Sequence, residues 1–140
     1  MKVLVDTNVI LDVLLIQWPF YTDSSIIYKL SEIKHISGVI SSVSMPNIFY
    51  ILRRNGKNNI EAYQELDKLN IIFTVASVSE TTVSAALALR WKDFEDAIQF
   101  VTAKEIEVDF IITRNKTDFQ SSDIPCMTPT EYIAYLKINE

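Results

Sequence analysis

The sequence predicts an α/β fold with three layers, in which helices cover both faces of a mostly parallel central sheet of about five strands. Short apolar runs alternate along the chain with stretches whose apolar residues recur at helical spacing. The strand runs are almost continuously apolar, as expected for parallel strands that are buried on both faces. The chain has 140 residues, of which 49% are hydrophobic, so we expect a single domain over residues 1–140.

Two strands and four helices are predicted in the N-terminal half. Trp18-Pro19 ends the first helix, because proline interrupts regular structure. Ser44 followed by Pro46 is typical of a helix start. The predicted elements are a strand at 2–5, a helix over 9–15, a helix from 22 towards 37, a weak strand at 39–40, and helices over 44–54 and 58–70.

The C-terminal half alternates in the same way. Ser79 and Asp93 are each placed to cap a helix. Thr128, Pro129 and Glu131 supply the cap, the first-turn proline and the third-residue glutamate of a final helix. The predicted elements are a strand at 71–75, a helix over 81–90, a helix from 93, a strand at 110–113, a short strand within 123–127 and a helix from 128.

Charge and composition limit the chemistry that the chain can perform. Eighteen acidic residues against 13 basic ones give a net charge of −5, which argues against a protein that mainly coats nucleic acid. One cysteine, Cys126, and one histidine, His35, exclude an internal disulfide and a Cys/His zinc cluster within one chain. A metal site would therefore be built from oxygen ligands, which suit Mg²⁺ or Mn²⁺.

We expect no membrane association. The most apolar stretch, residues 9–16, is too short to span a bilayer and contains Asp12. The single thiol and the lack of a signal-peptide pattern make the cytoplasm the expected compartment.

Acidic and polar side chains gather where the predicted strands end. Residues 6–8 follow the first strand, and residues 113–118 follow the fourth. Asp93 and Asp96 share one face of the helix that leads into the fourth strand. Ligands of parallel sheets bind at the carboxyl ends of strands, and Mg²⁺ is held there by a few carboxylates together with substrate phosphate. This pattern predicts metal-assisted chemistry on a phosphodiester.

Four segments of the chain resemble the PIN domain family. They are Val-Leu-Val-Asp-Thr-Asn-Val at 3–9, Ser-Val-Ser-Met-Pro-Asn-Ile at 42–48, Lys-Asp-Phe-Glu-Asp-Ala at 92–97 and Ile-Ile-Thr-Arg-Asn-Lys-Thr-Asp-Phe at 111–119. The resemblance covers nearly the whole chain in the family's order. It implies a metal-dependent ribonuclease with Mg²⁺ or Mn²⁺ as cofactor, often the toxin of a VapBC-type toxin–antitoxin pair. RNA, a cognate antitoxin and a second copy of the chain are then the candidate partners.

The resemblance also assigns the site residues. The family's acids fall on Asp6, Asp96 and Asp118, with Asp93 as a further carboxylate that could touch the metal. The polar residues expected to line the site are Thr7, Asn8, Asn47, Thr113 and Asn115. Arg114 and Lys116 lie beside these positions and are candidates for contacts with RNA phosphates.

At two positions the sequence departs from the family. Asn47 stands where the family usually has glutamate, and Asn115 where many members have aspartate. An amide oxygen can touch a metal but brings no charge. We therefore expect Asn47→Glu or Asn115→Asp to tighten metal binding. The alternative function is a PIN-fold module that binds RNA or a protein partner without cleaving.

Each acid also has a structural explanation. Asp6 could equally cap the first helix, and Asp93 is better explained as a cap than as a ligand. Asp96 lies in a helix first turn, where acids are common, and Asp118 could stabilise a turn. Only the convergence of Asp6, Asp96 and Asp118 in one cleft would separate a metal site from these explanations. A receiver-like domain phosphorylated on Asp6 is disfavoured, because it would need paired acids after the first strand.

Overall fold

β1 occupies the centre of a five-stranded sheet in the computed structural model, which describes residues 1–139. The strand order is β3-β2-β1-β4-β5, and every pair is parallel. The strands are β1 (Lys2–Val5), β2 (Ser37–Ser41), β3 (Thr74–Ala76), β4 (Phe110–Ile112) and β5 (Cys126–Met127). Val5 pairs with Ile112, so β1 and β4 end side by side.

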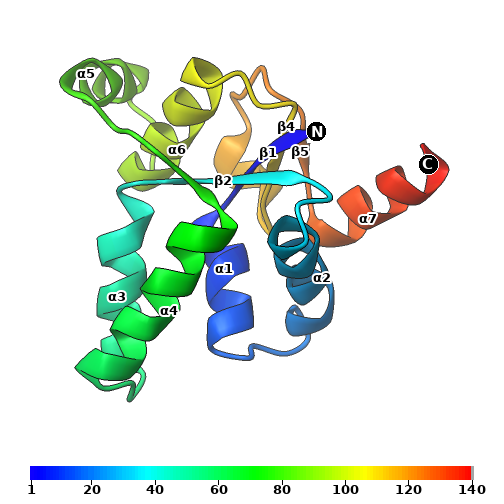
Figure 1. Cartoon of the computed structure of the whole chain (residues 1–140). Helices are drawn as coiled ribbons and strands as arrows, with labels where there is room; N and C mark the ends of the chain where they lie inside the picture. The colour runs from blue at the N-terminus through cyan, green and yellow to red at the C-terminus, as the bar shows by residue number, and fades with distance from the viewer. Residues whose placement is uncertain (140) are drawn as a thin grey trace.

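Helices cover both faces of this sheet and confirm the three-layer prediction. Figure 1 shows α5 and α6 on one side of the strands and α1 to α4 on the other. Successive residues of β1 alternate between the two cores: Val3 and Val5 pack with the α1–α4 side, and Leu4 with the α5–α6 side. The helices are α1 (Thr7–Leu14), α2 (Tyr21–Glu32), α3 (Ser44–Arg54), α4 (Asn59–Ile72), α5 (Glu80–Leu89), α6 (Phe94–Glu105), α7 (Pro129–Ile138) and the 3₁₀ helix η1 (Lys116–Phe119).

Three of the helix starts are fixed by reciprocal hydrogen bonds between the cap and the third residue. These capping boxes pair Asn58 with Glu61, Ser79 with Thr82, and Thr128 with Glu131. They confirm the helix start predicted at 58 and the caps predicted at Ser79 and Thr128. None of the helices among residues 1–139 has the length and apolar character needed to cross a membrane.

The structure corrects two local predictions. The third strand begins at Thr74 rather than at residue 71, because α4 continues to Ile72 and leaves Ile71 exposed on its surface. Ser44 does not cap α3. It is the first residue of that helix, fully buried, and its hydroxyl contacts the hydroxyl of Thr7 at 2.7 Å. A tertiary contact with α1 has replaced the local cap that the sequence suggests.

Candidate active site

Asp6 lies where β1 ends and α1 begins, and only 4% of it is exposed. It occupies the N-cap position of α1, but its side chain makes no capping hydrogen bond. Instead Oδ1 accepts a hydrogen bond from Nε2 of Gln99 at 3.0 Å, and Oδ2 accepts one from Oγ1 of Thr113 at 2.9 Å. Burial raises the pKa of Asp6, and these two hydrogen bonds partly offset the rise. The Asp6 side chain therefore bonds to α6 and to the residue after β4, and its role as a site residue stays a prediction.

Gln99 joins Asp6 to Asp96. Its Nε2 also lies 3.4 Å from Oδ1 of Asp96, one helical turn earlier on α6. Burial, together with the negative charges of neighbouring carboxylates, of which Asp6 is the strongest, raises the pKa of Asp96 to about 8. Asp6 and Asp96 thus share one electrostatic environment, as their sequence positions predict.

Asp93 and Asp118 complete the acidic side of the site. Asp93 caps α6, because its Oδ1 accepts a hydrogen bond from the backbone N–H of Asp96 at 3.0 Å. Asp118 is exposed on η1. Asp93, Asp96 and Asp118 line a groove of about 720 Å³, and the charges of Asp93 and Asp118 both contribute to the raised pKa of Asp96. The cap predicted at Asp93 is present, and its role as a metal ligand stays a prediction.

Glu95 lies beside these acids and was not among the residues expected in the site. Its Oε1 accepts a hydrogen bond from Oγ1 of Thr7 at 2.9 Å, and its Oε2 accepts one from Nδ2 of Asn47 at 2.7 Å. Burial raises the pKa of Glu95, and the charge of Asp6 adds to the rise. The only sequence signal for Glu95 was its place between Asp93 and Asp96, where an acid is also favoured by the helix dipole.

The predicted polar lining divides into buried and exposed residues. Thr113 is buried and holds Asp6, whereas Asn8 is exposed at the start of α1. Asn115 is exposed, its backbone N–H donates to Oγ1 of Thr113, and its Oδ1 accepts from the hydroxyl of Thr117. The side chain of Asn115 therefore contacts a neighbour in η1 rather than one of the acids.

Arg114 and Lys116 are both engaged in ion pairs within the fold. Nε of Arg114 lies 3.1 Å from Oδ2 of Asp12, a fully buried carboxylate, and its guanidinium lies 4.2 Å above the ring of Phe20. The Nε–H is not aligned for a hydrogen bond, so this contact is an ion pair only. Lys116 pairs with Glu131 at 3.0 Å on the surface. The Arg114 guanidinium thus lies against Asp12 of α1. An RNA phosphate would have to compete with Asp12 for the predicted contact with Arg114.

The donor atoms of this region are oxygens, which suit a hard cation by their chemistry. Among residues 1–139, no Lys, Arg or His side chain forms an ion pair with Asp6, Glu95, Asp96 or Asp118. Gln99 is 1% exposed, and its Oε1 has no hydrogen-bond partner. In the described part of the chain, however, no three Asp, Glu, His or Cys side chains lie close enough together to hold a metal ion. Ion binding would therefore require the carboxylates to move closer together.

The comparison with known families identifies the fold. The PIN domain family matches residues 2–117, which include Asp6, Asp93, Glu95 and Asp96 and end one residue before Asp118. The chain belongs to the PIN domain family. Among curated proteins, none is similar enough in sequence to count as a match.

Solved structures share this PIN fold at low sequence identity. A chain of VapBC-1 from nontypeable Haemophilus influenzae is 17% identical, with a TM-score of 0.69 over 93% of this chain and 99% of its own. A chain of FitAcB from Neisseria gonorrhoeae is 15% identical, with a TM-score of 0.66 over 91% and 98%. A chain of VapBC2 from Rickettsia felis, bound to a DNA fragment from its promoter, is 14% identical, with a TM-score of 0.64 over 91% of this chain and 98% of its own. At these identities the likeness concerns the fold alone.

The raised pKa of Asp96 predicts that metal-free stability falls as the pH rises. The folded chain keeps a proton on Asp96 up to about pH 8, whereas an unfolded aspartate releases it near pH 3.8. The free energy of unfolding should therefore fall between these values. We expect thermal midpoints measured in EDTA from about pH 5 to about pH 9 to fall less in Asp96→Asn than in the wild type. Asp67→Asn, on the exposed face of α4, is the control, and equal slopes in all three proteins would contradict the prediction.

The buried ion pair predicts unequal costs for the two basic residues after β4. Arg114→Ala leaves Asp12 fully buried without its cation, so we expect a loss of about 3 kcal/mol in the free energy of unfolding. Lys116→Ala removes an exposed pair and should cost less than about 1 kcal/mol. Urea unfolding of both variants measures the difference. Similar costs would mean that the Asp12 contact contributes little.

Proposed function

We propose that the chain is an endoribonuclease of PIN type that depends on Mg²⁺ or Mn²⁺. The observation that carries this proposal is a set of carboxylates, from the end of β1, from α6 and from η1, whose charges act on one another and that have no basic ion-pair partner in the described residues. Carboxylates in this arrangement repel one another. A divalent cation bound between these carboxylates would offset their repulsion and supply the metal that PIN-type cleavage requires.

In this proposal Asp6, Asp96 and Asp118 hold the cation. When bound, the cation lowers the pKa of a water molecule and offsets negative charge on the scissile phosphate. Thr113 and Gln99 orient the Asp6 carboxylate from two sides. Near neutral pH the carboxyl of Asp96 keeps its own proton, so this proton must leave before the oxygen can bind a cation.

Arg90 and Lys92 are the better candidates for contacts with RNA phosphates. Both lie in the turn between α5 and α6, both are exposed, and both line the groove that contains Asp93, Asp96 and Asp118. Neither forms an ion pair with an acid among residues 1–139. Free basic side chains at the edge of an acidic groove can bind a phosphate backbone while the acids hold a cation.

The role of a toxin with a cognate antitoxin is part of the same proposal. It is supported by the solved structures of similar fold, which include a toxin–antitoxin complex from Klebsiella pneumoniae and complexes named VapBC and FitAB. The sequence resemblance described above favours the same assignment, and it keeps a homodimer and a cytoplasmic location as expectations.

The second candidate function is a binding module that keeps the fold without cleavage. Two observations favour it: neither Asn47 nor Asn115 carries a charge, and the acids do not form a closed metal-binding group as they stand among residues 1–139. Such a module would bind RNA or a protein through the same groove.

Asp6→Asn should separate these two functions. We expect Mn²⁺ to raise the thermal midpoint of the wild type, since it binds the folded state alone, and to have no effect on Asp6→Asn. In Asp6→Asn, cleavage of single-stranded RNA should fall by more than roughly 10–100-fold, which is the loss expected when only a partner of a metal ligand is removed. If Mn²⁺ stabilises the wild type but no RNA is cut, the chain is a binding module. If Mn²⁺ shifts neither protein, the metal site is absent and the nuclease proposal fails.

RNA binding should depend on the turn between α5 and α6. In Asp6→Asn, which keeps RNA uncut, we expect Arg90→Ala/Lys92→Ala to weaken RNA binding and to lower its salt dependence by about one to two phosphate contacts. In the wild type the ammonium of Lys116 is paired with Glu131. Lys116→Ala should therefore change the RNA affinity and its salt dependence less. Fluorescence anisotropy over a range of salt concentrations measures both. A larger effect of Lys116→Ala would move the RNA contacts to η1.

A further inference from the structure

Glu95 connects three helices at the edge of the site. It lies in the first turn of α6, is half-buried, and has one hydrogen bond on each carboxylate oxygen. Thr7 in the first turn of α1 donates to Oε1 at 2.9 Å, and Asn47 in the first turn of α3 donates to Oε2 at 2.7 Å. A glutamate placed there only by the helix dipole would need neither contact.

The directions of these hydrogen bonds fix Glu95 as the acceptor. The hydroxyl of Thr7 donates to Oε1 and the amide of Asn47 donates to Oε2, an arrangement that suits the ionised carboxylate, which can only accept. The contact of 2.7 Å between Thr7 and Ser44 then requires that Ser44 donates to Thr7. Ser44 is fully buried and Thr7 is nearly so. The interior thus supplies a directed chain of neutral donors that ends on a negative side chain and places no cation beside it.

Gln99 gives an independent sign that a group bound at this place would complete the site. It lies four residues after Glu95 and three after Asp96, so all three side chains emerge from one side of α6. Its Nε2 donates to Asp6, yet its Oε1 is buried and has no partner. A buried acceptor without a donor is costly, and it is commonly satisfied by a bound water or ligand.

We propose that Glu95 is a further acidic ligand of the cation site, held in place by Asn47 and Thr7. This inference rests on the proposed metal-dependent function. It changes the role of position 47: Asn47 donates a hydrogen bond that fixes a carboxylate supplied by α6. The charge absent from α3 is then present on α6. Asn47→Glu by itself would bring a second carboxylate against Glu95, and should lower metal-free stability.

An isosteric exchange of charge across the Asn47–Glu95 hydrogen bond tests the inference. Glu95→Gln removes the carboxylate and keeps an oxygen that can accept from Thr7. In the double variant Asn47→Asp/Glu95→Gln, the amide of position 95 donates to the carboxylate of position 47, so the negative charge returns on the neighbouring side chain. We expect Glu95→Gln to weaken Mn²⁺ binding about tenfold or more, and the double variant to recover most of that loss. Isothermal titration with Mn²⁺ alone measures the affinity, so no cleavage assay is needed.

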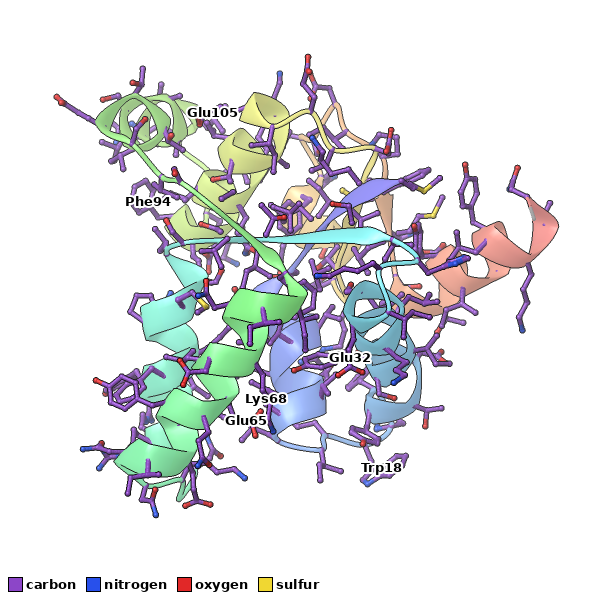
Figure 2. The ribbon with its side chains drawn as sticks, viewed as in Figure 1. Trp18, Glu32, Glu65, Lys68, Phe94 and Glu105 are labelled. Carbon is purple, nitrogen blue, oxygen red and sulfur yellow. The ribbon has the colours of Figure 1, made fainter. Side chains whose placement is uncertain are left out.

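Glu105→Gln is the matched control. Glu105 is a second glutamate on α6 that accepts a hydrogen bond from a threonine hydroxyl, that of Thr82 at 3.2 Å. Figure 2 shows Glu105 at the end of α6 opposite Phe94, the neighbour of Glu95. Its Mn²⁺ affinity should equal that of the wild type.

The outcomes separate this inference from the proposed function. Wild-type affinity in Glu95→Gln, with binding lost in Asp6→Asn, would overturn the role of Glu95 and leave the nuclease proposal standing. Weakened binding that the double variant does not recover would also overturn it, because the effect would then come from lost packing. Absence of Mn²⁺ binding in the wild type would overturn the inference together with the proposed function.

Discussion

The buried carboxylate of Asp6 is the constraint around which the site is arranged. A charged group in the interior is tolerated only when its oxygens are hydrogen-bonded, and both partners of Asp6 come from other elements. Thr113 reaches it because β1 and β4 are adjacent and in register at their carboxyl ends. Gln99 reaches it because α6 packs over the same end of the sheet, and the first turn of that helix then brings Asp96 to the same place. Sheet register and helix position are therefore coupled to one acidic side chain.

The parts of this arrangement that could be predicted from the sequence are those set by local pattern. Apolar runs located β1 and β4, and the acids directly after the strands or in a helix first turn located Asp6, Asp96 and Asp118. The role of Glu95 could not be predicted in this way, since its partners Thr7 and Asn47 are 88 and 48 residues away. The start of β3 was misplaced for a similar reason. The apolar run after residue 70 suits a strand or a helix end, and α4 continues to Ile72, which is buried.

The two uncharged positions have different consequences in three dimensions. Asn47 contacts a carboxylate, so the site keeps an acid beside that position. Asn115 has no such replacement: its side chain contacts Thr117, and its backbone N–H contacts Thr113, which in turn holds Asp6. At position 47 the negative charge is thus supplied by the neighbouring Glu95 instead. At position 115 no neighbouring acid contacts the asparagine side chain to replace the charge. A simple count of acids along the sequence would treat them as equal.

The arginine closest in sequence to the site does not form an ion pair with the acids of the site. Arg114 directly follows Thr113, which donates to Asp6, yet its guanidinium pairs with Asp12 on α1 and lies over Phe20. An arginine bonded to Asp6 would favour its ionised form and occupy the oxygens that a cation needs. Asp12 is fully buried and also accepts a hydrogen bond from Ser24 at 3.0 Å, which fixes its carboxylate beside the guanidinium. The acidic side chains are therefore kept free of basic partners by a second buried carboxylate that belongs to α1 and lies outside the groove.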